Sequence, residues 1–503
     1  MTQLIKTLDT IIIGSGVSGI GAAIRLTEQG MNDFLVLEKH QDLGGTWRDN
    51  TYPGCECDVP SALYSYSFEQ NPDWSRLFAG HDEILDYVRH TARKHGILPF
   101  IKYGIDVQQT RWNETENLWY VQTNAGLYKA AKVISCVGYL HEPIIPKLPG
   151  IENFNGEVFH SSRWQHDLDL TGKRVAVIGT GASAIQFIPQ IQPQVKELVA
   201  FQRTPQWILP KPNLRMNKLV RSIFKLPFTL NVFRGLLYTG MEMFGIGFRH
   251  PVLLKQMQRL AKAHINKHIK DSELREKVTP DYTMGCKRVL LSNNYYPAIA
   301  QKNVEVLATG VKEIRGNTVV GSNGEEREVD VIILGTGFHV SDVPVAKQVV
   351  GKKGLTLDQI WKGSPEAYRG TTIHDFPNFF LVLGPNLAIG HNSAFIVIES
   401  QLNYVMSALN EMQKRGLTRL EVNSRVQREY NEQVQKDLQT TVWNTGGCSS
   451  YYLDQNGKNS IGFPWSTFKM RSLLKQFDSA SYQLSKNSSA QPIASSEKKD
   501  EAA

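Results

Sequence analysis

The chain has 503 residues, 41% of them hydrophobic and 21% charged, an ordinary composition for a globular protein of two or three domains. Its net charge of +8 could favour nucleic acid, but the basic residues look scattered and no known nucleic-acid-binding motif is present, so we expect no such partner. No apolar run is long enough to span a membrane, and a nucleotide motif begins within the first fourteen residues, so we expect neither a transmembrane segment nor a signal peptide and predict a cytoplasmic protein.

The first predicted unit, residues 9–38, is a strand, a glycine-rich turn, a helix and a second strand. Its turn reads GSGVSG from Gly14 to Gly19 and fits the pattern Gly-x-Gly-x-x-Gly. Gly14 permits the tight turn, Gly16 lets the backbone approach a pyrophosphate, and Gly19 lets the helix pack on the strand. The helix N-terminus offers free N–H groups to the phosphates, and Glu38 at the end of the next strand would accept ribose hydroxyls. The unit therefore predicts a dinucleotide site.

A second unit of the same kind runs from residue 174 to 203. Its turn has the Gly-x-Gly-x-x-Ala form and consists of Gly179, Thr180, Gly181, Ala182, Ser183 and Ala184. Here the following strand ends in Arg203 and Thr204 instead of an acid. An arginine removes repulsion toward a 2′-phosphate and can hold it with its planar fork, so we predict NADPH at this site. The alternative is that Arg203 is an ordinary surface arginine.

Two further apolar runs, at residues 129–138 and 327–338, each contain or end in glycine, as expected for strands that lead into nucleotide turns. We assign both to the first domain, which the second domain then interrupts. The predicted fold is α/β, with two Rossmann-like dinucleotide-binding domains. The first comprises residues 1–140 and 328–484, and the NADPH-binding domain comprises residues 150–327.

Residues 205–285 are apolar, aromatic and basic, and they are predicted to form a helical insertion in the NADPH-binding domain. Two interpretations are open: a membrane-surface patch or lid over an apolar substrate, or helices packed on the second domain. Pro227, Gly235 and Gly240 would interrupt a single amphipathic helix, which favours the packed helices. Residues 485–503 lack apolar side chains that could be buried and are expected to be disordered.

Two dinucleotide sites in one chain indicate that NADPH passes electrons to a flavin, so the first site is assigned to FAD. The five cysteines bear on the final acceptor: Cys55, Cys57, Cys136, Cys286 and Cys448. A disulfide reductase would need a CxxC or CxxxxC pair near the flavin, whereas Cys55 and Cys57 form CxC. The odd, sparse set argues against a disulfide framework, and no second pair has metal-ligand spacing, so we expect no metal. The acceptor is then O₂ or a small oxidant.

Residues 154–164, FNGEVFHSSRW, resemble the FxGxxxHxxxW signature of type I Baeyer–Villiger monooxygenases, which are class B flavoprotein monooxygenases. Flavin-containing N/S-monooxygenases usually carry Tyr or Phe in place of Trp164, and Gln165 stands where the family commonly has Pro or Asp. A second family pattern, Ala/Gly-Gly-x-Trp-x4-Phe/Tyr-Pro-Gly/Met-x3-Asp, is matched at every fixed position from Gly44 to Asp58. With GTG at residues 335–337 and LGP at 383–385, the resemblance covers residues 9 to 470.

The resemblance implies an enzyme that uses FAD, NADPH and O₂ to convert a ketone or aldehyde to an ester or lactone through a C4a-peroxyflavin. It places Arg288 beside the flavin, where a permanent positive charge would stabilise the peroxide and the developing oxyanion. Asp58 would pair with Arg288 and position it, and Lys287 would reach the 2′-phosphate of NADPH. His160 would either couple domain motions or serve as a structural hydrogen-bonding residue.

The same resemblance places Gly45, Thr46, Trp47, Tyr64 and Val107 beside FAD, although the last three could equally be core residues. Tyr451 stands where the family often has a tryptophan on the nicotinamide side. The expected partners are O₂ and a small hydrophobic carbonyl compound, and peripheral membrane contact is not favoured. Alternative functions are N/S-oxygenation, an uncoupled NADPH oxidase or flavin reductase, and a non-catalytic flavoprotein.

Overall fold

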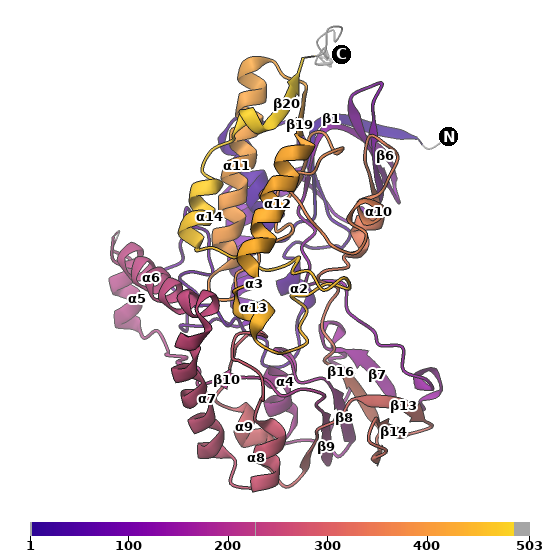
Figure 1. Cartoon of the computed structure of the whole chain (residues 1–503), viewed down its shortest axis with the longest axis vertical. Helices are drawn as coiled ribbons and strands as arrows, with labels where there is room; N and C mark the ends of the chain where they lie inside the picture. Colours follow the sequence, from indigo (N-terminus) through magenta and orange to yellow (C-terminus); the bar gives the residue numbers. More distant parts are fainter. Residues whose placement is uncertain (1–2, 227, 487–503) are drawn as a thin grey trace, which may run out of the picture.

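Two sheets with their surrounding helices form the upper and lower halves of the molecule in Figure 1. The computed structural model describes residues 3–226 and 228–486. The first sheet has eight strands in the order β17-β4-β5-β6-β1-β2-β3, and β18 also pairs with β6. These strands are β1 (Leu4–Ile13), β2 (Phe34–Leu37), β3 (Ile101–Lys102), β4 (Val107–Asn113), β5 (Leu118–Thr123), β6 (Gly126–Ser135), β17 (Val349–Val350) and β18 (Phe379–Leu381).

The strand β1 lies inside the first sheet and pairs in parallel with β2 and β6. Its apolar end is buried, as expected for a parallel strand that is covered on both faces. The helices of this half are α1 (Val17–Glu28), α2 (Thr46–Asp49), α3 (His81–Lys94), η1 (Leu98–Phe100), η5 (Pro344–Lys347), α10 (Leu357–Trp361), α11 (Ala394–Arg415), α12 (Ser424–Leu438), α13 (Val442–Thr445), α14 (Thr467–Leu473) and η6 (Ser479–Ser481). The antiparallel pair β19 (Arg419–Val422) and β20 (Tyr482–Ser485) also belongs here.

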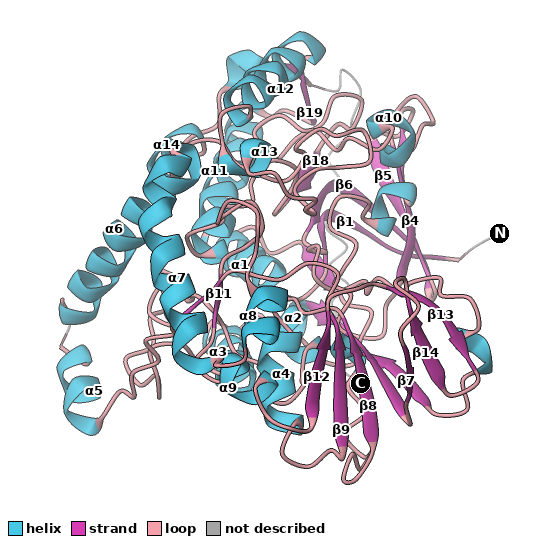
Figure 2. Cartoon of the chain, turned by 60° about the horizontal axis from the view of Figure 1, so that its bottom comes forward, coloured by secondary structure: helices cyan, strands magenta, loops and turns pink. Residues whose placement is uncertain are grey.

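The second sheet is wholly parallel, and Figure 2 shows its strands side by side. Its order is β12 (Val304–Leu307), β9 (Glu197–Phe201), β8 (Arg174–Ile178), β16 (Val331–Leu334) and β7 (Glu157–His160). Residues 327–338 are predicted to belong to the first domain, but their strand β16 pairs with β7 and β8, so that prediction and the boundary at residue 328 are wrong. The chain rejoins the first sheet at β17. A fully buried parallel strand looks alike in either sheet, so its sequence pattern does not indicate which sheet takes it.

Smaller elements complete the second half. They are α4 (Ala184–Ile191), α9 (Tyr295–Ile299), η2 (Ile151–Asn153), η3 (Ser161–Arg163), the antiparallel strands β13 (Val311–Arg315), β14 (Thr318–Gly321) and β15 (Glu326–Glu328), and the parallel pair β10 (Ile208–Leu209) and β11 (Leu290–Leu291). One cluster of buried side chains includes Ile12 of β1, Val177 of β8 and Phe187 of α4, so the two halves share an apolar core.

The predicted insertion contains the helices α5 (Lys218–Phe224), α6 (Thr229–Arg249), η4 (Pro251–Leu253), α7 (Leu254–His268) and α8 (Ser272–Val278). The helix α6 continues through Gly235 and Gly240, so the expectation that these glycines interrupt it was wrong, while Pro227 lies outside the described residues. The side chain of Tyr238 on α6 hydrogen-bonds Thr467 at 2.8 Å. This contact belongs to the first half, so the predicted packing on the second domain does not hold for α6.

Within residues 3–226 and 228–486, no helix is long and apolar enough to cross a membrane. Of the tail predicted to be disordered, residues 487–503 lie outside the described residues, whereas Ser485 is the last residue of β20.

Candidate active site at two glycine turns

The first glycine turn follows β1 and is closely packed by backbone atoms. Gly14 has a φ of 96°, and a Cβ there would lie 2.9 Å from the carbonyl oxygen of Cys136. A Cβ on Gly19 would lie 1.9 Å from the carbonyl oxygen of Gly14, and one on Gly45 would lie 2.9 Å from the Cα of Gly16. Only glycine fits such contacts. They place the Gly45 turn against the helix N-terminus where a pyrophosphate would bind.

Glu38 ends the next strand and is fixed by surrounding donors. Ser15 donates its N–H and its hydroxyl to Oε2 of Glu38 at 2.9 and 2.8 Å. Burial acts to raise the pKa of Glu38, but hydrogen bonds from the backbone of His40 and from Ser15, together with Arg48, bring that pKa below its ordinary value. Glu38 is therefore ionised at neutral pH and lies at the strand end where an acceptor for ribose was predicted.

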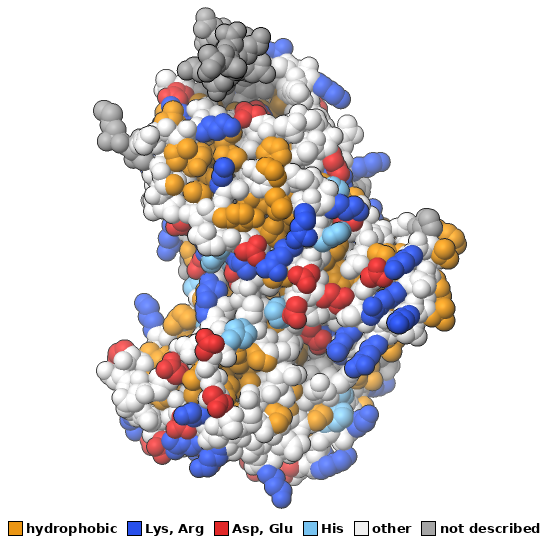
Figure 3. Space-filling view, turned by 180° about the vertical axis from the view of Figure 1, so that it is seen from behind, with side chains coloured by type: hydrophobic (Ala, Val, Ile, Leu, Met, Phe, Trp, Pro, Cys, Tyr) orange, Lys and Arg blue, Asp and Glu red, His pale blue; other side chains and the backbone are white. Residues whose placement is uncertain are grey.

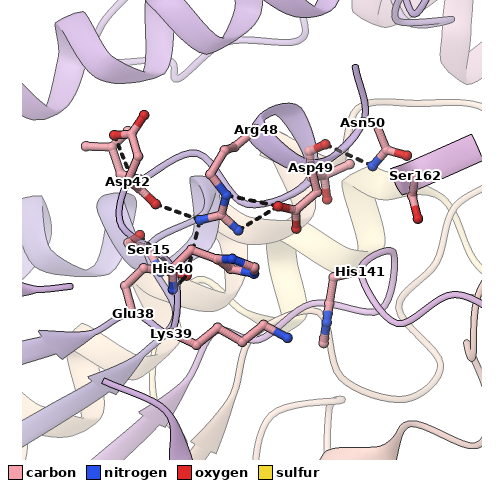
Figure 4. Close-up of polar contacts among 12 residues, drawn as sticks. Ser15, Glu38, Lys39, His40, Asp42, Arg48, Asp49, Asn50, His141 and Ser162 are labelled. Atoms are coloured by element: carbon pink, nitrogen blue, oxygen red, sulfur yellow. Dashed lines mark hydrogen bonds and ion pairs between the residues drawn. The ribbon is translucent and has the colours of Figure 1, made fainter. Parts of the chain in front are cut away.

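Arg48 organises this corner, as Figure 4 shows, although it was not singled out from the sequence. Its Nη1 lies 3.1 Å from Glu38 and donates to the carbonyl oxygen of Asp42 at 2.6 Å. Its Nε and Nη2 donate to Oδ1 of Asp49 at 2.9 and 2.8 Å. Arg48 occupies a variable position of the second family pattern, so no sequence signal pointed to it.

The second glycine turn packs against the turn that follows β16. Gly179 has a φ of 99°, and a Cβ there would lie 2.5 Å from the carbonyl oxygen of Gly335. By contrast, a Cβ on Gly181 would meet no atom within 4 Å, so the space beside this glycine is open to a ligand. The remaining residues of the turn lead into α4: Thr180, Ala182, Ser183 and Ala184.

Two positive charges lie close together beyond β9. Arg203 is exposed, Thr204 is half-buried, and the pKa of Lys287 is lowered, first by burial and then by the neighbouring Arg203. Among the residues that the structure describes, no carboxylate forms an ion pair with either cation. Asp281 is near enough to Lys287 to oppose the lowering of its pKa, but it forms no ion pair with the lysine. Two adjacent cations without an ion-paired carboxylate suit a bound phosphate, which is the feature that distinguishes NADPH from NADH.

Arg288 and Asp58 form a bidentate ion pair, as the family resemblance implied. Nε and Nη2 of Arg288 donate to the two carboxylate oxygens of Asp58 at 2.8 and 2.7 Å. Asp58 holds the pKa of Arg288 well above the ordinary value for arginine. Burial acts to raise the pKa of Asp58, but Arg288 brings that pKa below the ordinary value for aspartate. Both groups are ionised. Nη1 of Arg288 makes no hydrogen bond within the described residues, and the side chain is 33% exposed, so one donor edge stays available.

The loop that carries Asp58 is seated on α4 of the second half. Tyr52 donates its hydroxyl to Oε1 of Gln186 at 2.9 Å, and Nε2 of Gln186 donates to the carbonyl oxygen of Glu56 at 2.9 Å. A Cβ on Gly54 would lie 2.8 Å from the carbonyl oxygen of Gln186. Gln186 lies in the first turn of α4, so this loop connects the two glycine turns. No motif in the sequence pointed to Gln186.

Lys211 is a second residue that the sequence reasoning missed. It is only 5% exposed, and its Nζ lies 2.6 Å from Glu56 and donates to the carbonyl oxygen of Cys57 at 3.0 Å. Its charge also helps to lower the pKa of Asp58, after the larger contribution of Arg288. A lone lysine between prolines carries no recognisable motif, so only the tertiary contacts reveal it.

His160 is the buried last residue of β7. Its Nδ1 accepts a hydrogen bond from the N–H of Ser162 at 3.1 Å, and its ring lies 5.6 Å from that of Phe338. Burial lowers its pKa to about 4, so the ring is neutral at pH 7. These contacts agree with a structural hydrogen-bonding role, and the predicted coupling of domain motions stays a prediction.

Three tyrosines lie near enough to Arg288 to interact with it electrostatically: Tyr139, Tyr451 and Tyr452. Tyr451 is 45% exposed and stacks on Tyr452 with ring centroids 4.5 Å apart. After Asp58 and burial, Tyr451 and Tyr452 are the next influences on the pKa of Arg288, and burial raises the pKa of the nearby Tyr139 to about 12. Tyr451 is therefore near the cation, and its predicted place on the nicotinamide side stays a prediction. Tyr139 and Tyr452 were missed because single tyrosines carry no spacing signal.

A disulfide joins Cys286 to Cys448, across 162 residues of sequence. It ties the segment of Lys287 and Arg288 to the loop that carries Tyr451. The cysteine count had argued against a disulfide framework, and for this pair that expectation is wrong, because distant cysteines can meet only through the fold. The other three cysteines are free and buried, and burial raises the pKa of each thiol, that of Cys55 to about 12.

The predicted FAD contacts at Trp47, Tyr64 and Val107 lie in packed surroundings. Trp47 follows Thr46 in α2 and donates its Nε1–H to the hydroxyl of Tyr64 at 3.1 Å. The ring of Tyr64 meets that of Phe395 edge-on at 4.9 Å. Val107 is half-buried at the start of β4 and packs against a separate core cluster. Their packing fits the core interpretation, and contact with FAD stays a prediction.

Among the described residues, one group has metal-ligand geometry, formed by His374, Asp375 and Glu421. Cations already neutralise its carboxylates: Lys352 lies 2.6 Å from Glu421, and Lys353 lies 2.9 Å from Asp375. The group is better described as a salt-bridge network, and Cys55 and Cys57 are not part of it.

Comparison with known proteins agrees with this geometry. Residues 8–355 match the family model described as flavin-binding monooxygenase-like. A Baeyer–Villiger monooxygenase of Pseudomonas aeruginosa is 49% identical over 478 residues, with 94% of this chain and 90% of the relative covered. One of Streptomyces coelicolor is 46% identical over 492 residues, with 97% and 95% covered.

Solved structures give the same result. The crystal structure of OTEMO with FAD and NADP superposes with a TM-score of 0.86 at 26% identity, covering 95% of this chain and 99% of that one. Cyclohexanone monooxygenase from Rhodococcus sp. Phi1 bound to NADP⁺ gives a TM-score of 0.85 at 26% identity, with 96% and 99% covered. The chain therefore belongs to the flavin-binding monooxygenase-like family and, within it, to the Baeyer–Villiger monooxygenases.

Proposed function

We propose that this chain uses FAD, NADPH and O₂ to convert a small hydrophobic ketone or aldehyde to an ester or lactone in the cytoplasm. The observation that carries the proposal is the Arg288–Asp58 pair, which is ionised, bidentate and still accessible at one donor edge. Asp58 belongs to a loop that contacts the helix after the second glycine turn, so the pair lies where two dinucleotides would meet.

The residues present fit both cofactors. The tight contacts of Gly14, Gly16 and Gly45, with the ionised Glu38, suit the pyrophosphate and ribose of FAD. The open side of Gly181 suits NADPH, as do the cations Arg203 and Lys287, which form no ion pair with a carboxylate of the described residues. When bound, FAD supplies the redox chemistry that activates O₂.

The contribution of the chain's own residues is electrostatic. Asp58 fixes the guanidinium of Arg288 through two hydrogen bonds and leaves Nη1 to stabilise negative charge that develops on a reacting oxygen. Arg288 stays charged throughout, because the pKa of an arginine paired with a carboxylate is far above neutral pH. No protein nucleophile is needed.

An apolar cavity suits the proposed substrate class. Among its lining residues are Tyr139, Val340, Trp361, Leu383 and Pro385. Tyr139 also lies near Arg288, since both the arginine and Tyr451 influence its pKa after the larger effect of burial. A carbonyl compound in this cavity would be shielded from water.

The test uses the purified, FAD-loaded protein. NADPH should reduce the flavin anaerobically better than NADH does, and O₂ with linear, cyclic and aryl ketones should then yield esters or lactones, measured by gas chromatography and mass spectrometry. Stoichiometric H₂O₂ with every ketone would indicate an oxidase instead.

Arg288→Ala separates the proposal from its rivals. It should still bind FAD but lose ester formation by about 100-fold or more, because it removes a preorganised charge. Arg288→Lys, which keeps the charge but not the fork, should lose less. An Arg288→Ala variant that oxidises ketones at the normal rate would contradict the proposed role, and one that loses only ketone oxidation while oxidising sulfides would support it.

A further inference from the structure

The helices of the insertion carry an exposed apolar surface. Twenty large hydrophobic residues are exposed in the described chain, and twelve of them lie between residues 214 and 260. These twelve are Leu214, Leu219, Ile223, Leu226, Phe228, Val232, Leu236, Met243, Ile246, Val252, Leu253 and Leu260. Exposed hydrophobic residues that occur singly are normal, but their concentration in one segment indicates an interaction surface.

Five of these side chains form a stripe along α6 and the residue before it. Phe228, Val232, Leu236, Met243 and Ile246 recur at helical spacing, and Phe228, Leu236 and Met243 are each 68% exposed. A surface helix ordinarily turns its polar face to solvent. The helix α6 turns apolar residues to solvent instead.

The opposite face of α6 is already anchored, so the exposed stripe is not a core face turned outward. Arg234, Tyr238 and Glu242 recur every four residues on that inward face. Arg234 donates to the backbone of Ser65 at 3.1 Å, and Glu242 lies 2.9 Å from His391. The orientation of the helix is therefore fixed by polar contacts, and the apolar stripe has to face outward.

The same segment concentrates positive charge. Residues 211–270 contain twelve Lys and Arg and a single acidic residue, Glu242, which is 5% exposed. Eight of the twelve basic residues are exposed; Lys211 is buried against Glu56, and Arg221, Arg234 and Arg249 are half-buried. The segment contributes +11 to a chain whose net charge is +8, so the rest of the chain is net negative. The basic residues are therefore concentrated in this segment, whereas the composition had suggested that they are scattered along the chain.

The surface therefore needs a partner with both negative charge and an apolar interior. Figure 1 shows α5 and α6 projecting from the side of the molecule, and Figure 3 shows this projection from behind, with hydrophobic side chains at its outer edge and Lys and Arg beside them. A second copy of the chain would bring the same positive charge, and nucleic acid offers no apolar phase. An anionic phospholipid bilayer has both properties.

We propose that the segment from α5 to α7 is a peripheral membrane-binding surface for anionic phospholipid. The apolar stripe enters the interface between headgroups and acyl chains, and the surrounding Lys and Arg contact the headgroups. In this mode of binding the protein lies on the surface of the bilayer, and no described helix is long and apolar enough to cross it. This inference is independent of the oxidation chemistry.

The experiment measures binding of the FAD-loaded protein to vesicles of phosphatidylcholine, with and without about a third phosphatidylglycerol, by flotation. The test variant is Leu236→Glu/Met243→Glu, at two exposed positions of the stripe. The control is Leu4→Glu/Leu355→Glu, which changes the charge equally at residues that are 48% and 44% exposed elsewhere. Flavin absorbance and the melting temperature confirm that both variants fold.

We expect the protein to bind the anionic vesicles. This binding should weaken at high salt, and binding to the neutral vesicles should be weaker. The test variant should bind at least about tenfold more weakly, because two apolar contacts with the bilayer are lost, while the control should bind like the wild type. Absence of binding at low salt, or equal loss in both variants, would overturn the proposal. A different outcome is possible if the wild type binds no vesicles but forms dimers in sedimentation equilibrium. If the test variant abolishes these dimers, the stripe would instead be assigned to contact with a second copy of the chain.

Discussion

Single side chains decide the electrostatics of the site. Arg288 satisfies one edge of its guanidinium with Asp58 and leaves the other edge open, whereas Arg48 uses all three of its nitrogens on Glu38, Asp42 and Asp49. An arginine whose three nitrogens all bind protein acceptors holds structure, while one with an unpaired nitrogen can bind a reacting oxygen. This difference is why we assign chemistry to Arg288 and a structural role to Arg48.

At the same scale, Lys287→Gln and Arg203→Gln should each weaken the binding of NADPH. Each removes a charge-assisted contact with the 2′-phosphate, which corresponds to roughly a tenfold or greater rise in the dissociation constant. NADH lacks that phosphate, so its weaker binding should not change. Calorimetric titration of the FAD-loaded protein with NADP⁺ and NAD⁺ measures both, and an equal effect on the two nucleotides would contradict the assignment.

At the scale of elements, α6 depends on one buried carboxylate. Glu242 lies 2.9 Å from His391 and accepts hydrogen bonds from Asn392 at 3.1 Å and from the N–H of Thr467 at 3.2 Å. Burial acts to raise the pKa of Glu242, but His391 and the other donors lower it to about 2, from 4.5 in the unfolded chain. The stabilisation is therefore present above pH 4.5 and is lost as the pH falls toward 2.

Glu242→Gln should consequently lower the free energy of unfolding by on the order of 2 kcal/mol at pH 7. The difference from the wild type should shrink as the pH falls from 5 to 3, in thermal or urea unfolding. Glu429→Gln, at an exposed glutamate whose side chain is 55% accessible, is the control and should show no such difference. A difference in the free energy of unfolding between Glu242→Gln and the wild type that is the same at all pH values would contradict the role assigned to the ionised carboxylate.

The disulfide between Cys286 and Cys448 also acts at this scale, because it joins the Arg288 segment to the Tyr451 loop. Cys448→Ser should lower the free energy of unfolding under oxidising conditions by about 2–4 kcal/mol, a typical value for a cross-link that closes a long loop. In a reducing agent the variant and the wild type should melt together. Alkylation of protein from fresh cell extract would show whether the bond exists in the cell, since reducing cytoplasm disfavours it.

At the scale of the whole molecule, the two halves meet where the loop of Asp58 rests on α4. Gly54 has a φ of 78° and no room for a Cβ, whereas Gly30 has a φ of 73° with no atom within 4 Å of the Cβ position. Gly54→Ala should push the loop from α4 and lower ester formation roughly 10- to 100-fold while FAD stays bound, because small misplacements are costly. Gly30→Ala carries similar backbone strain and should affect stability alone. Equal kinetics in the two variants would contradict this interpretation.

The sequence alone determined the local chemistry. Glycines at fixed spacing between a strand and a helix predict a nucleotide turn, because the close backbone contacts of such a turn leave no room for a side chain. Gly14 and Gly179 located the two turns in this way. The pairing of Arg288 with Asp58, 230 residues apart, was expected only through the family resemblance, and the structure shows the contact.

The tertiary structure alone decided which distant segments meet. The strand β16 joined the second sheet, and Cys286 met Cys448, because neither an apolar run nor a lone cysteine carries information about its partner. The solvent-facing apolar stripe of α6 is the clearest case. Its helix is apolar around most of its circumference, so the face turned outward is set by buried contacts of Arg234 and Glu242 that no periodicity in the sequence reveals.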